Sequence, residues 1–74
     1  MTDKTSPPMP SVNTVWRHYK GGRYAVVGKC RLAETGELGV LYRPIGREQV
    51  WCRPLTEWHE PVLMGGVRFV KEAL

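Results

Sequence analysis

A tryptophan-led segment, Trp16-Arg17-His18-Tyr19-Lys20-Gly21-Gly22, runs directly into a stretch of alternating character, Arg23–Leu32. Within the second stretch the charged residues fall at odd-numbered positions, and the even-numbered positions hold apolar residues or glycine. This period of two is typical of a half-buried β-strand, because successive side chains point to opposite faces of a sheet. The predicted core face of this strand consists of Tyr24, Val26, Gly28, Cys30 and Leu32.

The residues on either side continue as short strands separated by turns. The glycine pair Gly21-Gly22 favours a tight turn, so a first strand is expected over 15–19. Glu34-Thr35-Gly36-Glu37 is typical of a hairpin turn. Pro44-Ile45-Gly46-Arg47 predicts another turn, because proline cannot donate a hydrogen bond into a central ladder. Further strands are therefore predicted over 38–43 and 49–53, and a last one over 67–70 after Gly65-Gly66.

The segment Pro54–Pro61 lacks this alternation and is too short for a stable helix by itself. Thr56 is placed to cap a single helical turn, and Glu57 lies near its N-terminus, where negative charge is favourable. Five short strands with one 3₁₀ or α turn before the last predict an all-β fold. The expected architecture is a small SH3-like barrel.

A chain of 74 residues allows one compact domain with a thin core. Residues 1–13 contain three prolines and little apolar surface, so they are predicted to be a disordered tail. Residues 14–74 then form a single small β-barrel domain. Neither a signal peptide nor an apolar stretch long enough to span a membrane is present in the sequence, and we expect a cytoplasmic protein without membrane association.

The formal net charge is +4, and the positive charge is concentrated in the middle of the chain. Between residues 17 and 53 there are eight basic and three acidic side chains. A basic body favours anionic partners such as nucleic acid. The same charge also lies in the range that keeps any small domain soluble, so that alternative stays open.

Nucleophilic catalysis needs a nucleophile, a base and an orienting group that converge in space. Both serines and the single aspartate lie in the predicted tail, which excludes a Ser-His-Asp arrangement. A cysteine with a histidine is the remaining catalytic alternative. Because Cys30 lies on the predicted core face, where a thiol is usually inert, we expect no enzymatic activity.

Metal and phosphate chemistry find little support in the sequence. The two cysteines and two histidines stand singly, whereas structural zinc sites draw their ligands from close pairs. Lys20-Gly21-Gly22 lacks the serine or threonine that follows the lysine in a phosphate-binding loop. No metal and no other cofactor is therefore expected, and Cys30 and Cys52 are expected to stay thiols in a reducing compartment.

Aromatic and basic residues that recur together form the candidate ligand-binding set. Aromatic rings stack on nucleic-acid bases, and guanidinium groups grip phosphate or carboxylate. For Arg53, an ion pair with Glu57 or Glu60 is the structural alternative. The candidates are Arg17, His18, Lys20, Arg43, Trp51 and Arg53.

Alternation divides the opening segment between two faces. Arg17 and Tyr19 share one face, and His18 and Lys20 share the other. Tyr19 is assigned to the core, whereas Trp51 stays open between the centre of the core and a surface platform. The exposed part of the segment is expected to be His18 and Lys20, with Arg17 as a further member.

A set of motifs is spread along the chain: Trp16-Arg17-His18-Tyr19-Lys20-Gly21, Tyr24-x-Val26-x-Gly28, Glu34-Thr35, Val40-x-Tyr42, Trp51-x-Arg53-Pro54, Glu60 and Arg68-Phe69. In these motifs the chain resembles a short bacterial family of domains of unknown function, numbered sixteen-fifty-three. The resemblance extends from about residue 15 to residue 70. In place of the His-Ser pair that family members usually carry before Glu34-Thr35, this chain has Leu32-Ala33, so any site that used that pair is altered here. The resemblance implies no established biochemical activity.

Two functional hypotheses follow. The first is a non-enzymatic binding module for an anionic partner, either nucleic acid, a nucleotide or an acidic peptide. The second is a structural or protein-interaction domain that acts through an exposed strand edge or a homodimer. The expected state is a monomer or a weak homodimer.

Overall fold

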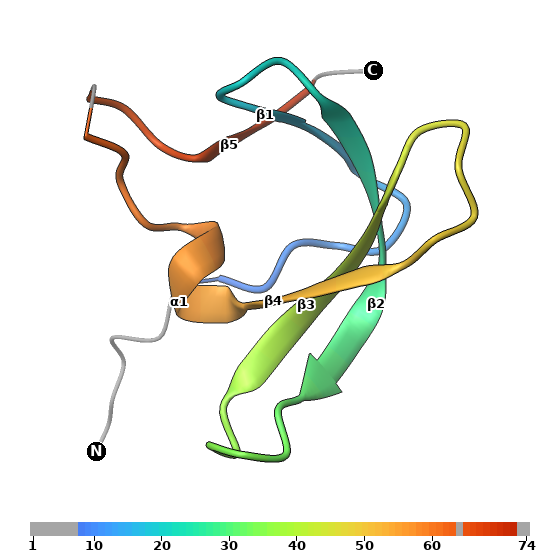
Figure 1. Cartoon of the computed structure of the whole chain (residues 1–74), viewed down its shortest axis with the longest axis vertical. Coiled ribbons are helices and arrows are strands. Elements are labelled where there is room, and N and C mark those ends of the chain that lie inside the picture. The colour runs from blue at the N-terminus through green and yellow to red at the C-terminus, as the bar shows by residue number, and fades with distance from the viewer. Residues whose placement is uncertain (1–7, 64, 73–74) are drawn as a thin grey trace.

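The computed structural model describes residues 8–63 and 65–72, which form one antiparallel sheet and one short helix (Figure 1). The strand order is β4-β3-β2-β1-β5. The all-β prediction is confirmed. The sheet has open edges at β4 and β5, so the SH3-like barrel stays a prediction. The elements are β1 (Val15–His18), β2 (Arg23–Arg31), β3 (Leu38–Pro44), β4 (Trp51–Pro54), α1 (Leu55–Trp58) and β5 (Phe69–Lys71).

The long β2–β3 hairpin forms the centre of the sheet. Its strands pair from Tyr24 opposite Pro44 to Arg31 opposite Leu38. Gly36 has a φ of 77° in the hairpin turn, and Gly46 has a φ of 86° in the turn after β3. Both values lie in the left-handed region that glycine adopts without strain. The two predicted turns are therefore confirmed.

A β-bulge interrupts β2 between Val26 and Gly28, and it corrects the predicted core face. Before the bulge, Val26 lies opposite Tyr42, and both are buried. After it, Cys30 lies opposite Gly39, one position out of step with buried Val40. An extra residue shifts the pairing by one, so the later side chains point to the other face. The assignment of Gly28 and Cys30 to the core was therefore wrong.

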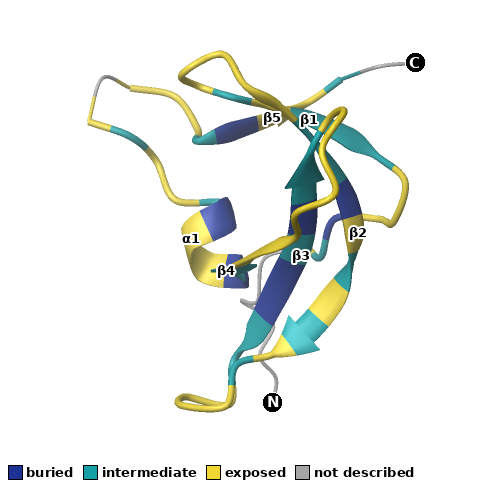
Figure 2. Cartoon of the chain, turned by 45° about the vertical axis from the view of Figure 1, so that its right-hand side comes forward, coloured by how far each residue is buried: buried dark blue, intermediate teal, exposed yellow. Residues whose placement is uncertain are grey.

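The core lies between the concave face of the sheet and α1 (Figure 2). Trp58 is 1% exposed and stacks on Phe69 of β5, with ring centroids 3.9 Å apart. Edge-on contacts join the same indole to Trp16 at 5.5 Å and to Tyr42 at 5.2 Å. The four-residue helix α1 thus places the Trp58 ring between β5 and the middle of the sheet. The buried core is Val26, Val40, Tyr42, Leu55, Trp58 and Phe69.

The helix begins where β4 ends. Pro54 occupies its N-cap position, and no side chain within residues 8–63 and 65–72 caps it, so the predicted cap at Thr56 was wrong. The Thr56 hydroxyl instead donates to Glu37 Oε1 at 3.4 Å. Proline fixes its own φ near the helical value and lacks an N–H, which suits the junction between a strand and a helix.

Residues 1–7 of the predicted tail lie outside the described residues. The part of that tail that is described, residues 8–13, lies along the domain. Pro10 is buried and Met9 packs against the core. The Pro8 carbonyl is 2.7 Å from His59 Nε2, and the Asn13 N–H donates to the Val26 carbonyl. Among the residues described, no helix has the length and hydropathy needed to cross a membrane.

Candidate ligand-binding face

The register of the strands divides five of the six candidate residues between the two faces of the sheet. In β4, Trp51 lies opposite Tyr42 and Arg53 lies opposite Val40, which places both on the concave face. His18 lies on the same face, because its ring contacts Phe69 at 5.0 Å. Alternation places Arg17 and Arg43 on the outer face, and Lys20 lies in the turn after β1.

Trp51 and Arg53 line a hollow of about 260 Å³ on the concave face, which we call the aromatic–basic groove. Its other walls are Tyr24, Tyr42 and Pro44. Trp51 is 49% exposed, whereas Tyr42 is 6% exposed and belongs to the core. The question left open by the sequence is therefore settled: Trp51 is a surface residue.

The Arg53 side chain is held in place by its neighbours. Its Nε donates to the Tyr42 hydroxyl at 3.2 Å, and its Nη1 contacts Glu57 Oε1 at 3.4 Å. The guanidinium carbon lies 5.6 Å from the centre of the Phe69 ring, within reach of a cation–π interaction. The ion pair with Glu57, which is the structural alternative from the sequence, is thus present. The same guanidinium also contacts the Phe69 ring.

His18 extends this face toward β1, and three basic side chains act on its ring. Burial lowers the pKa of His18, and the charges of Arg53, Arg68 and Lys20 lower it further. The Lys20 backbone N–H donates to Nδ1 at 3.2 Å, which fits a neutral ring that carries its proton on Nε2. Three cations therefore act on one point of the concave face.

Tyr19 is 44% exposed, so its assignment to the core was wrong. Strand β1 ends at His18, and the alternation used to assign Tyr19 does not continue past that end. Its ring lies 4.6 Å from the His18 ring and carries Lys20 Nζ 5.7 Å from its centre. The Arg68 guanidinium carbon is 6.0 Å from the same ring centre. Arg68 lies within the predicted last strand over 67–70, where it alternates with Val67 and Phe69, but it is not one of the six candidate residues.

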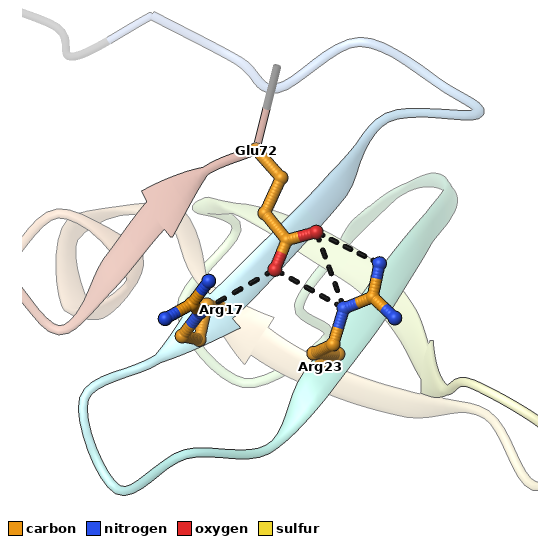
Figure 3. A network of polar contacts seen from close by, with 3 residues as sticks. All are labelled: Arg17, Arg23 and Glu72. Carbon is orange, nitrogen blue, oxygen red and sulfur yellow. Dashed lines mark hydrogen bonds and ion pairs between the residues drawn. The ribbon is translucent and has the colours of Figure 1, made fainter. Parts of the chain in front are cut away.

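Arg17 and Arg43 do not join this face. Arg17 Nε donates to Glu72 Oε2 at 3.4 Å, and Arg23 Nη2 donates to Glu72 Oε1 at 2.8 Å (Figure 3). The hydrogen bond from Arg23, followed by that from Arg17, lowers the pKa of Glu72. On the same outer face, Arg43 Nη1 donates to the Arg47 carbonyl at 3.1 Å. The sequence contained no local pattern that linked Glu72 to β1 and β2.

The histidines and cysteines do not gather into one cluster within the part of the chain that the structure describes. His18 lies on the concave face and Cys52 on the outer face, because Cys52 alternates with Trp51 and Arg53. His59 Nε2 contacts the Pro8 carbonyl. Within residues 8–63 and 65–72, no group of three or more His, Cys, Asp and Glu side chains is arranged to hold a metal ion.

A family model described as "Protein of unknown function (DUF1653)" matches residues 14–71 and confirms the resemblance seen in the sequence. Neither the curated proteins nor the solved structures contain a match to the chain.

Proposed function

The chain belongs to the DUF1653 family of unknown function, and from the geometry of its concave face we propose that it is a non-enzymatic module that binds single-stranded nucleic acid. The aromatic–basic groove receives a base, and the cations beside it receive the phosphate. Arginine and aromatic side chains in combination are a common means of holding a single strand without reading its sequence.

The observation that carries this proposal is the exposed indole of Trp51 beside a half-buried guanidinium. A single exposed apolar residue needs no explanation, because much of any protein surface is apolar. Here, however, the ring lies in a hollow with two tyrosines, and the same hollow contains Arg53. Stacking of a base on Trp51 would leave its phosphate near a guanidinium that Tyr42 already orients.

The charges in the groove and around His18 support an anionic ligand. Arg53 pairs with Glu57, and Arg68 pairs with Glu60 at 3.1 Å, but both carboxylates are about half exposed. Ion pairs with exposed partners contribute only about 0–1 kcal/mol, so a phosphate can replace either carboxylate at small cost. Lys20 adds a third cation, and after burial, which is the larger cause, the charges of these three residues lower the pKa of His18 further.

We also propose that the open sheet is an SH3-like barrel completed by α1. The two edge strands, β4 and β5, are not paired with each other. Trp58 of α1 stacks on Phe69 of β5 and contacts Tyr42 of β3, so the helix fills the opening. In this arrangement the groove lies at the edge of the core, where the core residue Tyr42 forms one of its walls.

The test is a binding titration with a fluorescently labelled single-stranded oligonucleotide at several salt concentrations. Trp51→Ala is expected to weaken binding about 5-fold to 150-fold, because one stacked base contributes about 1–3 kcal/mol. Val50→Ala is the matched control, since Val50 is 50% exposed and adjacent to Trp51 but does not line the groove. Affinity is also expected to fall as salt rises, because phosphate contacts release counterions.

Equal affinities for the two variants, or an affinity independent of salt, would overturn the proposal. Tighter binding of an acidic peptide than of the oligonucleotide would assign the groove to a protein partner instead.

The open edges of the sheet favour a second candidate, an interaction module that pairs with another strand. Val70 in edge strand β5 is 57% exposed, and Val67 just before it is 48% exposed. Edge strands with exposed apolar side chains are templates for strand pairing. This candidate requires a homodimer or complex whose stability is indifferent to salt, measured by light scattering after gel filtration.

A further inference from the structure

The two cysteines meet on the outer face of the sheet, opposite the aromatic–basic groove. Cys30 is in β2 and Cys52 is in β4, and their sulfur atoms are 2.9 Å apart. Strand β3 runs between them, and its Gly39 lies opposite Cys30. Both residues are free thiols. Side chains on strands separated by a third strand do not normally touch, because two strand spacings amount to about 9.5 Å in a flat sheet.

Gly39 allows this contact because it has no side chain. A Cβ atom built on Gly39 would lie 2.9 Å from the Cys30 sulfur and 3.0 Å from the Cys52 sulfur. Any other residue would therefore occupy the space in which the two thiols meet. Gly39 itself is buried and has no φ in the left-handed region, so backbone conformation does not explain the glycine.

We propose that Cys30 and Cys52 form a reversible disulfide above Gly39 by exchange with a low-molecular-weight disulfide. One thiol loses its proton, and the thiolate attacks a sulfur of the small disulfide, which releases one small thiolate. The second cysteine then attacks the mixed disulfide and releases the other small thiolate. The two cysteines are oxidised by two electrons, the small disulfide is reduced to two thiols, and the two protons pass to the released thiolates.

The same geometry predicts how the reaction depends on pH. Desolvation of the sulfur, together with the hydrogen bond with Cys30, raises the pKa of the Cys52 thiol to about 11. Because the thiolate is the nucleophile, attack by Cys52 is slow at neutral pH and accelerates as pH rises. The sulfur atoms must also approach by about 0.9 Å to reach a bond length of about 2.05 Å.

A disulfide at this place would join edge strand β4 to β2. Strand β4 has four residues and pairs only with β3 within the described sheet. It carries Trp51 and Arg53 on its opposite face, so the link would hold the residues that line the groove. That consequence rests on the proposed function, whereas formation of the disulfide does not.

The experiment uses the full chain in a buffer of oxidised and reduced glutathione, followed by acid quenching and intact-mass analysis. The expected product has lost two hydrogens, about 2 Da, and resists alkylation at both cysteines. The equilibrium constant is expected to be at least about tenfold larger for the native protein than for the same chain in urea, because folding holds the thiols together. Equal constants, or a native product that carries two glutathione groups, would overturn the proposal.

Two glycine variants test the role of the gap, which is the space above Gly39 in which the two sulfur atoms meet. Gly39→Ala is expected to slow formation of the disulfide at least about tenfold, because its methyl group separates the sulfur atoms. Gly28→Ala is the matched control, since its Cβ would meet only Leu41 Cδ1, at an ordinary 3.6 Å. Circular dichroism verifies that each variant is folded. A folded Gly39→Ala protein that forms the disulfide as fast as Gly28→Ala would refute the role of the gap. If Gly39→Ala does not fold, the comparison between native and urea-denatured wild type still decides the proposal.

Discussion

Replacing each of two tryptophans with alanine should separate the residue that supports the fold from the residue available to a ligand. Trp58 is 1% exposed, and its loss removes the ring that packs against Phe69, Trp16 and Tyr42. Truncation of a buried tryptophan costs about 3–5 kcal/mol. Among the residues that the structure describes, the buried Trp58 indole N–H has no hydrogen-bond partner, so its removal recovers part of that cost and favours the lower end, about 3 kcal/mol.

Trp51→Ala should cost much less. Its side chain is 49% exposed, so about half of the usual 1.5–3 kcal/mol for a large apolar side chain is lost, roughly 1 kcal/mol. No cavity forms, because solvent fills the groove. The two variants should therefore differ by about 2 kcal/mol. For a domain of 74 residues the whole free energy of unfolding is about 4–11 kcal/mol, so the loss of Trp58 removes roughly a quarter to three quarters of it.

Urea unfolding followed by far-UV circular dichroism measures this difference without relying on indole fluorescence. With a slope near 1 kcal/mol per molar urea, the midpoints of the two variants should lie about 2 M apart. Equal midpoints, or a larger loss for Trp51→Ala, would refute the assignment of Trp58 to the core and of Trp51 to the surface. In either case a binding defect of Trp51→Ala could no longer be interpreted as the loss of a local contact with the ligand.

Two further predictions concern pH. The pKa of Glu72 is lowered, mainly by the hydrogen bond from Arg23, so its contribution to stability is present above the unfolded pKa and is lost as pH falls through the folded pKa. The difference in unfolding free energy between wild type and Glu72→Gln should therefore be present at neutral pH and shrink as pH falls below the usual carboxyl pKa of about 4.3. Urea denaturation at a series of pH values measures this difference, and a difference that stays constant over the series would contradict the prediction. His18 has a lowered pKa, so its NMR titration should have a midpoint below 6.5, and Arg53→Gln should move that midpoint partway upward, because burial remains the larger cause. Arg17→Gln, on the other face, is the control, and an unchanged midpoint in Arg53→Gln would show that Arg53 does not act on His18.

The strands and turns were predictable because their signals are local. The predicted strand over 23–32 corresponds to Arg23–Arg31, and the predicted strand over 38–43 corresponds to Leu38–Pro44. Gly36 and Gly46 occupy the positions that need a positive φ. In each case a few adjacent residues determine the backbone, through period-two alternation or through the conformational freedom of glycine.

The features that were not predictable depend on contacts between distant segments. The bulge in β2 follows Val26, and the pair Val26-Val27 is apolar at both positions, so no charge marks the shift of register. The choice of core tryptophan is a second case. The sequence drew attention to Trp51 in a strand, whereas Trp58 fills the core from a helix too short to show periodicity.

The junction between β4 and α1 explains why one short strand presents different chemistry on its two faces. Leu55 and Trp58 must face the core, and Pro54 joins the helix to β4 without an intervening residue, so the helix fixes the register of the strand. With that register, alternation directs Trp51 and Arg53 to the groove and Cys52 to the outer face. The bulge in β2 then directs Cys30 to the outer face as well, where Gly39 leaves room for the two sulfurs. A shift of β4 by one residue would bury Cys52 and remove both Trp51 and Arg53 from the groove, so the core packing of Trp58 and the arrangement of both candidate sites depend on the same register.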